Sequence, residues 1–255
     1  MRLGFIGTGV ITAHIVRGLK TSVLADWPVI VSPRSAGVAA ELALLPGVTV
    51  AQDNQSVIDG ADVVVLAVRP QIAAEVLAPL RFDPLCPVVS LMAGISLEDI
   101  ARWTGGGHDI CRAIPLPSVE ARACVTPVFP PQPAAMQLFA ALGQAFGVKD
   151  LSGFDAYATG SAVMATWFGF AETVSGWMAE NGIAEKDAET YVRGLFGNLG
   201  DTLRASSRPM EDLRHDHATK GGLNEQAFRV FGQEGGVEAL RAGMNSVMSR
   251  VSGKA

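Results

Sequence analysis

Residues 4–12 read GFIGTGVIT, and this stretch decides the fold of the first half of the chain. An apolar run typical of a buried strand leads into Gly7 and Gly9, and an amphipathic helical pattern follows them. The spacing matches GxGxx(G/A), with Thr12 and Ala13 as small residues where the helix would pack on the sheet. The first glycine permits a tight turn, and the second lets a pyrophosphate approach the amides of the helix N-terminus. The stretch therefore predicts a dinucleotide site, and the alternative is a purely structural turn.

Short apolar runs alternate with helical patterns from the N-terminus to about residue 150. The strand candidates are RLGFIG, PVIVS, VTVA, ADVVVLAV, PVVSLMA and the region around DICRAI. Continuous apolar strands separated by helices are typical of a parallel sheet covered on both faces. Strand-like runs then vanish, and long helical patterns follow at 154–180, 185–204 and 224–250. We therefore predict an α/β fold, with a Rossmann-type parallel-sheet domain over residues 1–150 and an all-helical domain over residues 151–255.

The composition excludes several classes of protein. With 49% hydrophobic and 18% charged residues, the 255-residue chain has enough apolar material for a sizeable core, which argues against disorder. A net charge of −5 without a dense Lys/Arg run argues against a nucleic-acid-binding surface. Cys86, Cys111 and Cys124 show no CxxC spacing, which suits a reducing, cytoplasmic setting. The apolar segment 162–179 carries Glu172, so we expect a core or interface helix and not a membrane span.

The end of the second predicted strand selects the cofactor. Enzymes that bind NAD usually carry an acidic residue there for the ribose hydroxyls. This chain instead has Ser32, Arg34 and Ser35, with no acid until Glu41. A guanidinium with two hydroxyls suits a 2′-phosphate better than a bare ribose, so we expect NADPH in preference to NADH. The alternative is a solvated arginine on a turn.

Two more stretches, LAVRPQ (66–71) and VSLMAGIS (89–96), end strands at the carboxyl edge where such sheets bind ligands. Either could be a simple strand–helix connection, but beside the glycine loop a crevice lining is favoured. The residues predicted to contact the cofactor are Gly7, Thr8, Gly9, Val10, Ile11, Ser32, Arg34, Ser35, Ala67, Val68, Pro70 and Ala93.

Five stretches in this order and spacing, GFIGTG, ADVVVLAVRPQ, VSLMAGIS, RAIPLPS and KGGLNEQAF, resemble the pyrroline-5-carboxylate reductase family. The resemblance covers essentially the whole chain. It implies NAD(P)H-dependent reduction of the cyclic imine 1-pyrroline-5-carboxylate to L-proline, a step of proline biosynthesis. It also implies that the helical domain interlocks with a second subunit, giving a homodimer or a higher homo-oligomer with the active site near the dimer interface. A partner surface would cover the apolar segment 162–179.

Three stretches depart from the family pattern. Where members typically carry MPNTP, residues 114–118 read IPLPS, so Leu116 stands at the polar Asn position. Where they carry SGSGPAY, residues 159–165 read TGSAVMA, and only Gly160 and Ser161 match. The SPGGTT-like loop is TKGGLN at 219–224. Leu116, Val163 and Met164 would make the pocket wall more apolar, which hints at a bulkier or less polar imine.

The glycine pair Gly221-Gly222 interrupts a helical region. Bare amides at a helix start hold anions, so we expect both glycines to expose amides toward a substrate carboxylate. The residues predicted to bind substrate are Thr219, Gly221, Gly222, Leu223 and Ser161. Asn224 stands where the family has a Thr that is a candidate partner of the substrate nitrogen; it can donate or accept a hydrogen bond but cannot relay a proton through a hydroxyl. We predict that Asn224 and Lys220 are catalytic.

Lys220 has two interpretations. Pointing into the site, it would anchor an anionic group or donate a proton; pointing outward, it would be a solvated loop residue. His215 and His217 flank Asp216, but side chains two apart on a helix do not share a face, and we assign no metal. The alternatives to a cyclic imine reductase are an enzyme of the same fold for another imine or a β-hydroxy acid, and a non-catalytic NADPH-binding protein.

Overall fold

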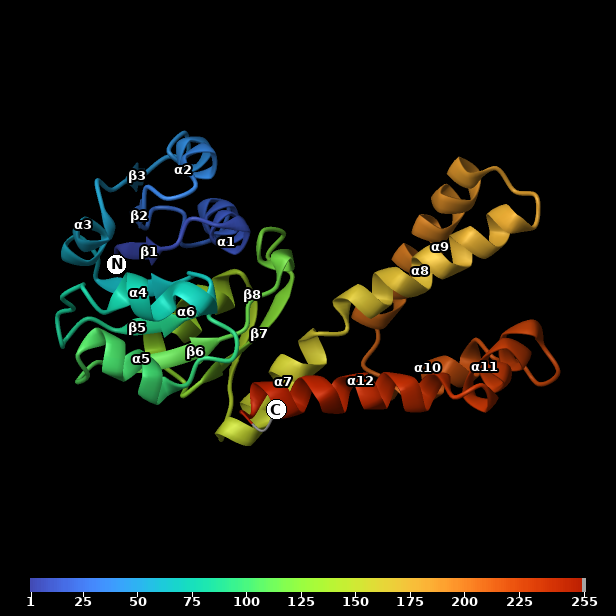
Figure 1. Cartoon of the computed structure of the whole chain (residues 1–255). Helices are drawn as coiled ribbons and strands as arrows, with labels where there is room; N and C mark the ends of the chain where they lie inside the picture. Colours follow the sequence, from blue (N-terminus) through green and yellow to red (C-terminus); the bar gives the residue numbers. More distant parts are fainter. Residues whose placement is uncertain (254–255) are drawn as a thin grey trace. The chain divides into compact units, whose positions relative to one another are not determined.

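The computed structural model describes residues 1–253 and divides into two compact units (Figure 1). The first contains residues 1–158 with the C-terminal residues from Arg250 on, and the second contains Thr159–Ser249. The predicted fold class, a parallel-sheet α/β region followed by an all-helical region, is confirmed. The domain boundary that we expected at residue 150 falls just before α7 (Leu151–Ser161), and a functional division there stays a prediction.

The first unit is built on an eight-stranded sheet in the order β3-β2-β1-β4-β5-β6-β7-β8. The strands are β1 (Leu3–Ile6), β2 (Val29–Val31), β3 (Val48–Val50), β4 (Val63–Leu66), β5 (Val88–Ser90), β6 (Ile110–Ala113), β7 (Cys124–Phe129) and β8 (Gly143–Gly147). Every pair is parallel except β6 with β7. The order reverses direction at β1 and β4, which places a crevice beyond their carboxyl ends.

Helices cover both faces of this sheet (Figure 1). They are α1 (Val10–Lys20), α2 (Ala36–Leu42), α3 (Asn54–Asp59), α4 (Ala73–Leu77), α5 (Leu97–Thr104) and α6 (Pro133–Ala141), with short 3-10 turns η1 (Pro70–Ile72) and η2 (Pro117–Val119). Along β4, Val63 and Val65 pack with α1, α2 and α6, whereas Val64 and Leu66 pack with α3, α4 and α5. Because successive side chains point to opposite faces, a strand buried on both sides must be apolar throughout.

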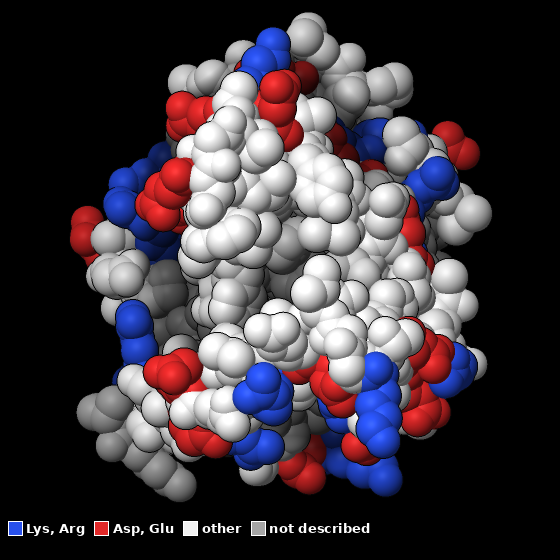
Figure 2. Space-filling model, turned by 90° about the vertical axis from the view of Figure 1, so that its right-hand side faces the viewer, with Lys and Arg blue, Asp and Glu red and all other residues white. Residues whose placement is uncertain are grey.

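The second unit contains α8 (Met164–Glu180), α9 (Glu185–Ala205), α10 (Met210–Asp216), α11 (Leu223–Gln233) and most of α12 (Gly236–Val251). Within the described chain α8, α10, α11 and α12 bury no residue, and α9 buries Ala188 and Val192. Phe168 is 72% exposed and Trp177 63%. Uncharged surface surrounds a central hollow in Figure 2. An apolar surface of this kind needs a partner to cover it.

The segment 162–179 is therefore not a core helix of a single chain. Glu172 on α8 is exposed, and its carboxylate has no partner among residues 1–253. None of the helices described is long and apolar enough to span a bilayer.

Candidate functional site

The loop between β1 and α1 is shaped for a close backbone approach. Gly7 has φ +102°, and a Cβ there would lie 2.5 Å from the carbonyl oxygen of Ala67, so no other residue fits. Gly9 caps α1 without a side-chain hydrogen bond, and a Cβ on it would meet nothing within 4 Å. The amides of Val10 and Ile11, in the first turn of α1, have no intrahelical acceptor. The loop thus presents an open set of N–H donors, the arrangement that binds a pyrophosphate.

Three side-chain hydroxyl groups hold this loop in shape through hydrogen bonds. Ser32 at the end of β2 is fully buried, and its Oγ accepts from the Gly7 amide at 3.0 Å. The Thr8 hydroxyl donates to the Ser32 carbonyl at 2.6 Å, and the Thr12 hydroxyl donates to the Gly7 carbonyl at 2.6 Å. The hydroxyls of Thr8 and Ser32 therefore hold the loop in shape, and direct contact of either with a cofactor stays a prediction.

The end of β2 also carries an unpaired cation. Arg34 is exposed and forms no ion pair within the described residues. Glu41, the nearest acid along the chain, is bound to Arg17 at 2.9 Å and does not compete for Arg34. Ser35 caps α2 with φ +64°, and its hydroxyl makes no capping bond. An arginine and a serine hydroxyl therefore remain available for a phosphate beside the loop.

The carboxyl edge of β4 and β5 borders the same crevice. The Ala67 amide donates to the Ile6 carbonyl at 2.8 Å, which joins this edge to the end of β1. Val68 is buried, and Pro70 begins η1. Ala93 is exposed after β5. Arg69 is an exposed cation next to Val68 at this edge, and it was not among the predicted cofactor residues. Its position in LAVRPQ, at the end of a strand, was the signal that could have included it.

A buried charge pair lies behind the end of β6, and the sequence did not reveal it. Arg112 is 5% exposed and Asp155 of α7 is 6% exposed, with Nη1 and Oδ1 3.8 Å apart. The guanidinium stacks over the Phe154 ring, 4.7 Å from its centroid. Burial lowers the pKa of the Arg112 guanidinium and raises the pKa of the Asp155 carboxyl, and each charge partly offsets the shift of the other.

Leu116 packs partly against the core of the first unit. It is half-buried against the core that covers α1, and its amide donates to Cys124 Sγ at 3.3 Å. A contribution of its half-exposed side chain to the apolar wall of a substrate site stays a prediction.

The glycine pair belongs to a turn that starts α11. The Gly222 amide donates to the Thr219 carbonyl at 2.8 Å, and Gly221 has φ +75°, which a glycine at the third turn position supplies. The Gly221 amide donates to Oε2 of Glu225 at 2.6 Å. Both glycine amides are thus bonded within the chain, and the expectation that they are bare is wrong. Glu225, the third helical residue, reaches back as in a capping box but to the amide one residue before the N-cap Gly222, and its position in GGLNE was the available signal.

The remaining residues of this turn are open to solvent. Lys220 is exposed and forms no ion pair in the described part of the chain. Leu223 is 84% exposed. Asn224 donates through Nδ2 to the His217 carbonyl at 2.8 Å, which leaves its Oδ1 as the group it presents. Ser161 ends α7, away in sequence from the turn. No group of three or more His, Cys, Asp or Glu side chains in residues 1–253 is arranged to hold a metal.

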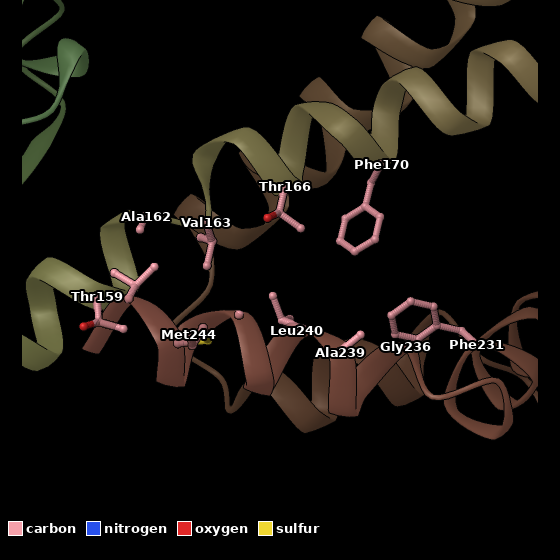
Figure 3. A pocket seen from close by; sticks show the side chains of 12 residues that line it. Thr159, Ala162, Val163, Thr166, Phe170, Phe231, Gly236, Ala239, Leu240 and Met244 are labelled. Atoms are coloured by element: carbon pink, nitrogen blue, oxygen red, sulfur yellow. The ribbon is translucent and has the colours of Figure 1, made fainter. Parts of the chain in front are cut away.

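A cavity of about 400 Å³ lies within the second unit, between α8 and α12 (Figure 3). Phe170 and Phe231 close one end, and Thr159 and Thr166 are the hydroxyl-bearing residues of an otherwise apolar lining. Val163 lines it as well, whereas Met164 is exposed elsewhere on α8. No residue of the 219–224 turn is among those that line it, so the cavity and the predicted substrate residues are separate features.

Comparison with known proteins covers both units. Residues 2–94 match the family model described as NADP oxidoreductase coenzyme F420-dependent, and residues 154–253 match the model for pyrroline-5-carboxylate reductase dimerisation. The pyrroline-5-carboxylate reductase of Pseudomonas aeruginosa is 28% identical over 94% of this chain and 91% of its own length.

Solved structures share the fold over the full chain. The 1-pyrroline-5-carboxylate reductase of Streptococcus pyogenes superposes with a TM-score of 0.84 at 23% identity, covering 98% of both chains. The Plasmodium falciparum pyrroline carboxylate reductase with NADP bound superposes at 0.81, with 14% identity and coverage of 100% and 98%. The predicted resemblance is confirmed by the two matched models and the near-full-length relatives: the chain belongs to the pyrroline-5-carboxylate reductase family of NAD(P)-dependent reductases.

Proposed function

We propose that this chain is an NADPH-dependent reductase of a cyclic imine, with 1-pyrroline-5-carboxylate to L-proline as the reference reaction. The observation that carries the proposal is the glycine loop, where Gly7 lies against Ala67 and the first amides of α1 are open. Beside it, Arg34 has no ion pair within residues 1–253. Membership of the reductase family supplies the imine class of substrate.

The first unit would hold the cofactor, which supplies the hydride when bound. The amides of Val10 and Ile11 suit the pyrophosphate, because a helix start offers both free donors and a favourable dipole. Arg34 suits a 2′-phosphate, since its guanidinium can make two parallel hydrogen bonds to phosphate oxygens. Val68 and Pro70 would form the apolar wall of the crevice, and Ala93 its small, exposed border.

The turn before α11 would bind the imine. A cyclic imine accepts hydride readily only when its nitrogen is protonated, so the site needs an acceptor for that N–H. Asn224 presents Oδ1 for this purpose, because its Nδ2 is bound to the His217 carbonyl. The Thr219 hydroxyl would contact a polar group of the substrate, and Leu223 would pack on the ring. The exposed ammonium of Lys220 would attract an anionic substrate.

We further propose a homodimer, or a higher homo-oligomer, formed through the helical unit. The match to a dimerisation model and the exposed aromatic residues of α8 support it. Formation of L-proline would place the enzyme in proline biosynthesis, and three free cysteines suit a cytoplasmic location.

The test is NADPH oxidation by purified protein with 1-pyrroline-5-carboxylate, 1-pyrroline-2-carboxylate and piperideine carboxylates. We expect turnover with NADPH well above that with NADH. R34Q should raise the KM for NADPH about ten- to hundredfold and leave NADH unchanged, because a charge-assisted contact is worth about 1.5–3 kcal/mol. R81Q, a change at another exposed arginine, is the matched control. A protein that binds NADPH but consumes none with any of these imines is not the reductase proposed.

Lys220 has no ion pair among the residues that the structure describes, which favours testing a second candidate, a dehydrogenase of a β-hydroxy acid that uses this lysine as its ionisable catalyst. Oxidation of β-hydroxy acids with NADP, abolished in K220A without loss of cofactor binding, would support it. Cofactor binding without turnover across both panels would instead indicate a non-catalytic NADPH-binding protein.

A further inference from the structure

The start of α11 carries a carboxylate of its own. Glu225 is the third residue of this helix, and its Oε2 accepts the Gly221 amide at 2.6 Å. The Gly222 amide is used by the Thr219 carbonyl. The two donors of the glycine pair are therefore saturated by groups of the chain itself.

Because the amides of Gly221 and Gly222 are already bonded, they are not free to bind a substrate carboxylate. A carboxylate is held by N–H donors, and a second one cannot share a donor already bound to Glu225. The charge of Glu225 is also not neutralised by a neighbour, since no cation pairs with it in residues 1–253. Two carboxylates at one turn repel each other, so the charge of Glu225 weakens the binding of a substrate carboxylate that reaches the remaining donors, the first amides of α11 and the Lys220 ammonium.

Apart from the Lys220 ammonium, which favours an anion, the exposed side chains at the start of α11 place no demand for a carboxylate on the substrate. Leu223, at the first helical position, offers an apolar side chain that is 84% exposed. Asn224 offers an acceptor oxygen to a protonated imine nitrogen. An apolar ring with one N–H can contact both Leu223 and Asn224, whether or not the ring carries a carboxylate.

We propose that Glu225 is a specificity-determining residue that takes the place of a substrate carboxylate and widens the substrate range to cyclic imines that lack one. The inference rests on the proposed imine reductase function. Glu225 competes with the acid group of 1-pyrroline-5-carboxylate, and 1-pyrroline, which has no acid group, meets no such competition.

The experiment compares kcat/KM for these two imines, with NADPH saturating, in the wild type, E225A, E225Q and E234Q. We expect the wild type to reduce 1-pyrroline with a kcat/KM within about tenfold of that for 1-pyrroline-5-carboxylate. E225A should raise the preference for the carboxylated imine at least tenfold, through a lower KM, and leave 1-pyrroline within twofold. E225Q keeps an acceptor for the Gly221 amide but removes the charge, so it should shift the preference the same way by less.

E234Q removes an exposed carboxylate at the other end of α11 and should change neither constant. If E225A lowers kcat/KM equally for both imines, Glu225 is a helix cap and the inference is wrong. A wild type that reduces only the carboxylated imine would also overturn it.

Absence of turnover with either imine would mark failure of the proposed function, so a binding measurement decides the inference independently. Calorimetric titration of the NADPH-loaded protein with L-proline and with pyrrolidine should show at least a tenfold gain in proline affinity in E225A and no gain for pyrrolidine. Equal affinities in the wild type and E225A would reject the role of Glu225.

Discussion

At Gly7 and Gly9 the same residue type is required for two different reasons. A Cβ at Gly7, which has φ +102°, would lie 2.5 Å from the Ala67 carbonyl oxygen. Gly9 has φ −97° and open space around its missing Cβ, so the folded chain alone places no demand on it. The missing side chain at Gly9 leaves room for a ligand at the start of α1, whereas the missing side chain at Gly7 lets the loop pack against Ala67.

The pair G7A and G9A separates these reasons. G7A should lower the free energy of unfolding by about 1–3 kcal/mol, because a residue with a side chain is strained at this φ and meets backbone atoms. G9A should keep the wild-type melting temperature and raise the Kd for NADPH at least about tenfold, equivalent to about 1.4 kcal/mol. Thermal melts and NADPH titrations of both variants measure these two effects. If G9A binds NADPH as tightly as the wild type, the proposal that this loop binds the pyrophosphate is wrong.

At the scale of the element, the buried pair between β6 and α7 should make stability depend on pH. Burial raises the pKa of Asp155 above its ordinary value of 3.8, so the folded state binds this proton more tightly than the unfolded state. The stabilising contribution is full below the unfolded pKa and is lost as the pH rises through the raised pKa. The free energy of unfolding of the wild type should therefore fall with rising pH in that window, relative to D155N.

Denaturant titrations of the wild type and D155N from pH 4 upward test this slope. D155N also leaves Arg112 without its counter-charge, which adds an offset that does not vary over this range, so the difference in slope is the informative quantity. E75Q, a change at an exposed carboxylate that makes no hydrogen bond or ion pair within residues 1–253, is the matched control. Parallel curves for the wild type and D155N would contradict the raised pKa.

Local patterns in the sequence predicted most elements, and the misses share a cause. Strands β1 to β6 follow from apolar runs. β1, β4 and β5 bury every residue and so have to be apolar on both faces, whereas the edge strand β3 exposes Thr49 and Val50. β7 and β8 were not predicted, since Pro127 interrupts the first and β8 is the half-exposed run GQAFG. Their place in the sheet depends on pairing between distant segments, which periodicity does not report.

The candidate site, like the fold, could be predicted from the sequence only where a local pattern determines it. The glycine loop follows from spacing, because its function requires bare backbone at fixed positions. The packing of Leu116 on the core, the Arg112–Asp155 pair and the bond from Gly221 to Glu225 all depend on which way a side chain points. Tertiary packing decides the first two. The third was local, and the spacing of Glu225 after the glycine pair already allowed it.

At the scale of the whole molecule, the helical unit leaves large apolar side chains exposed. Within the described chain α8 buries no residue, although Phe168 and Trp177 are among its side chains. Aromatic residues of this size dominate the energetics of protein interfaces. The unit should therefore depend on a second copy, which agrees with its match to a dimerisation model.

We expect light scattering to show a dimer or larger assembly, with a melting temperature that rises with protein concentration. F168E should weaken self-association at least about a hundredfold, equivalent to about 2.8 kcal/mol, because it sets a charge on the exposed apolar face of α8 that we expect the second copy to cover. L85E changes a leucine that is 89% exposed in the first unit and should leave association and melting unchanged, since scattered exposed apolar residues are ordinary. A monomeric wild type whose melting temperature is independent of concentration would show that α8 functions uncovered.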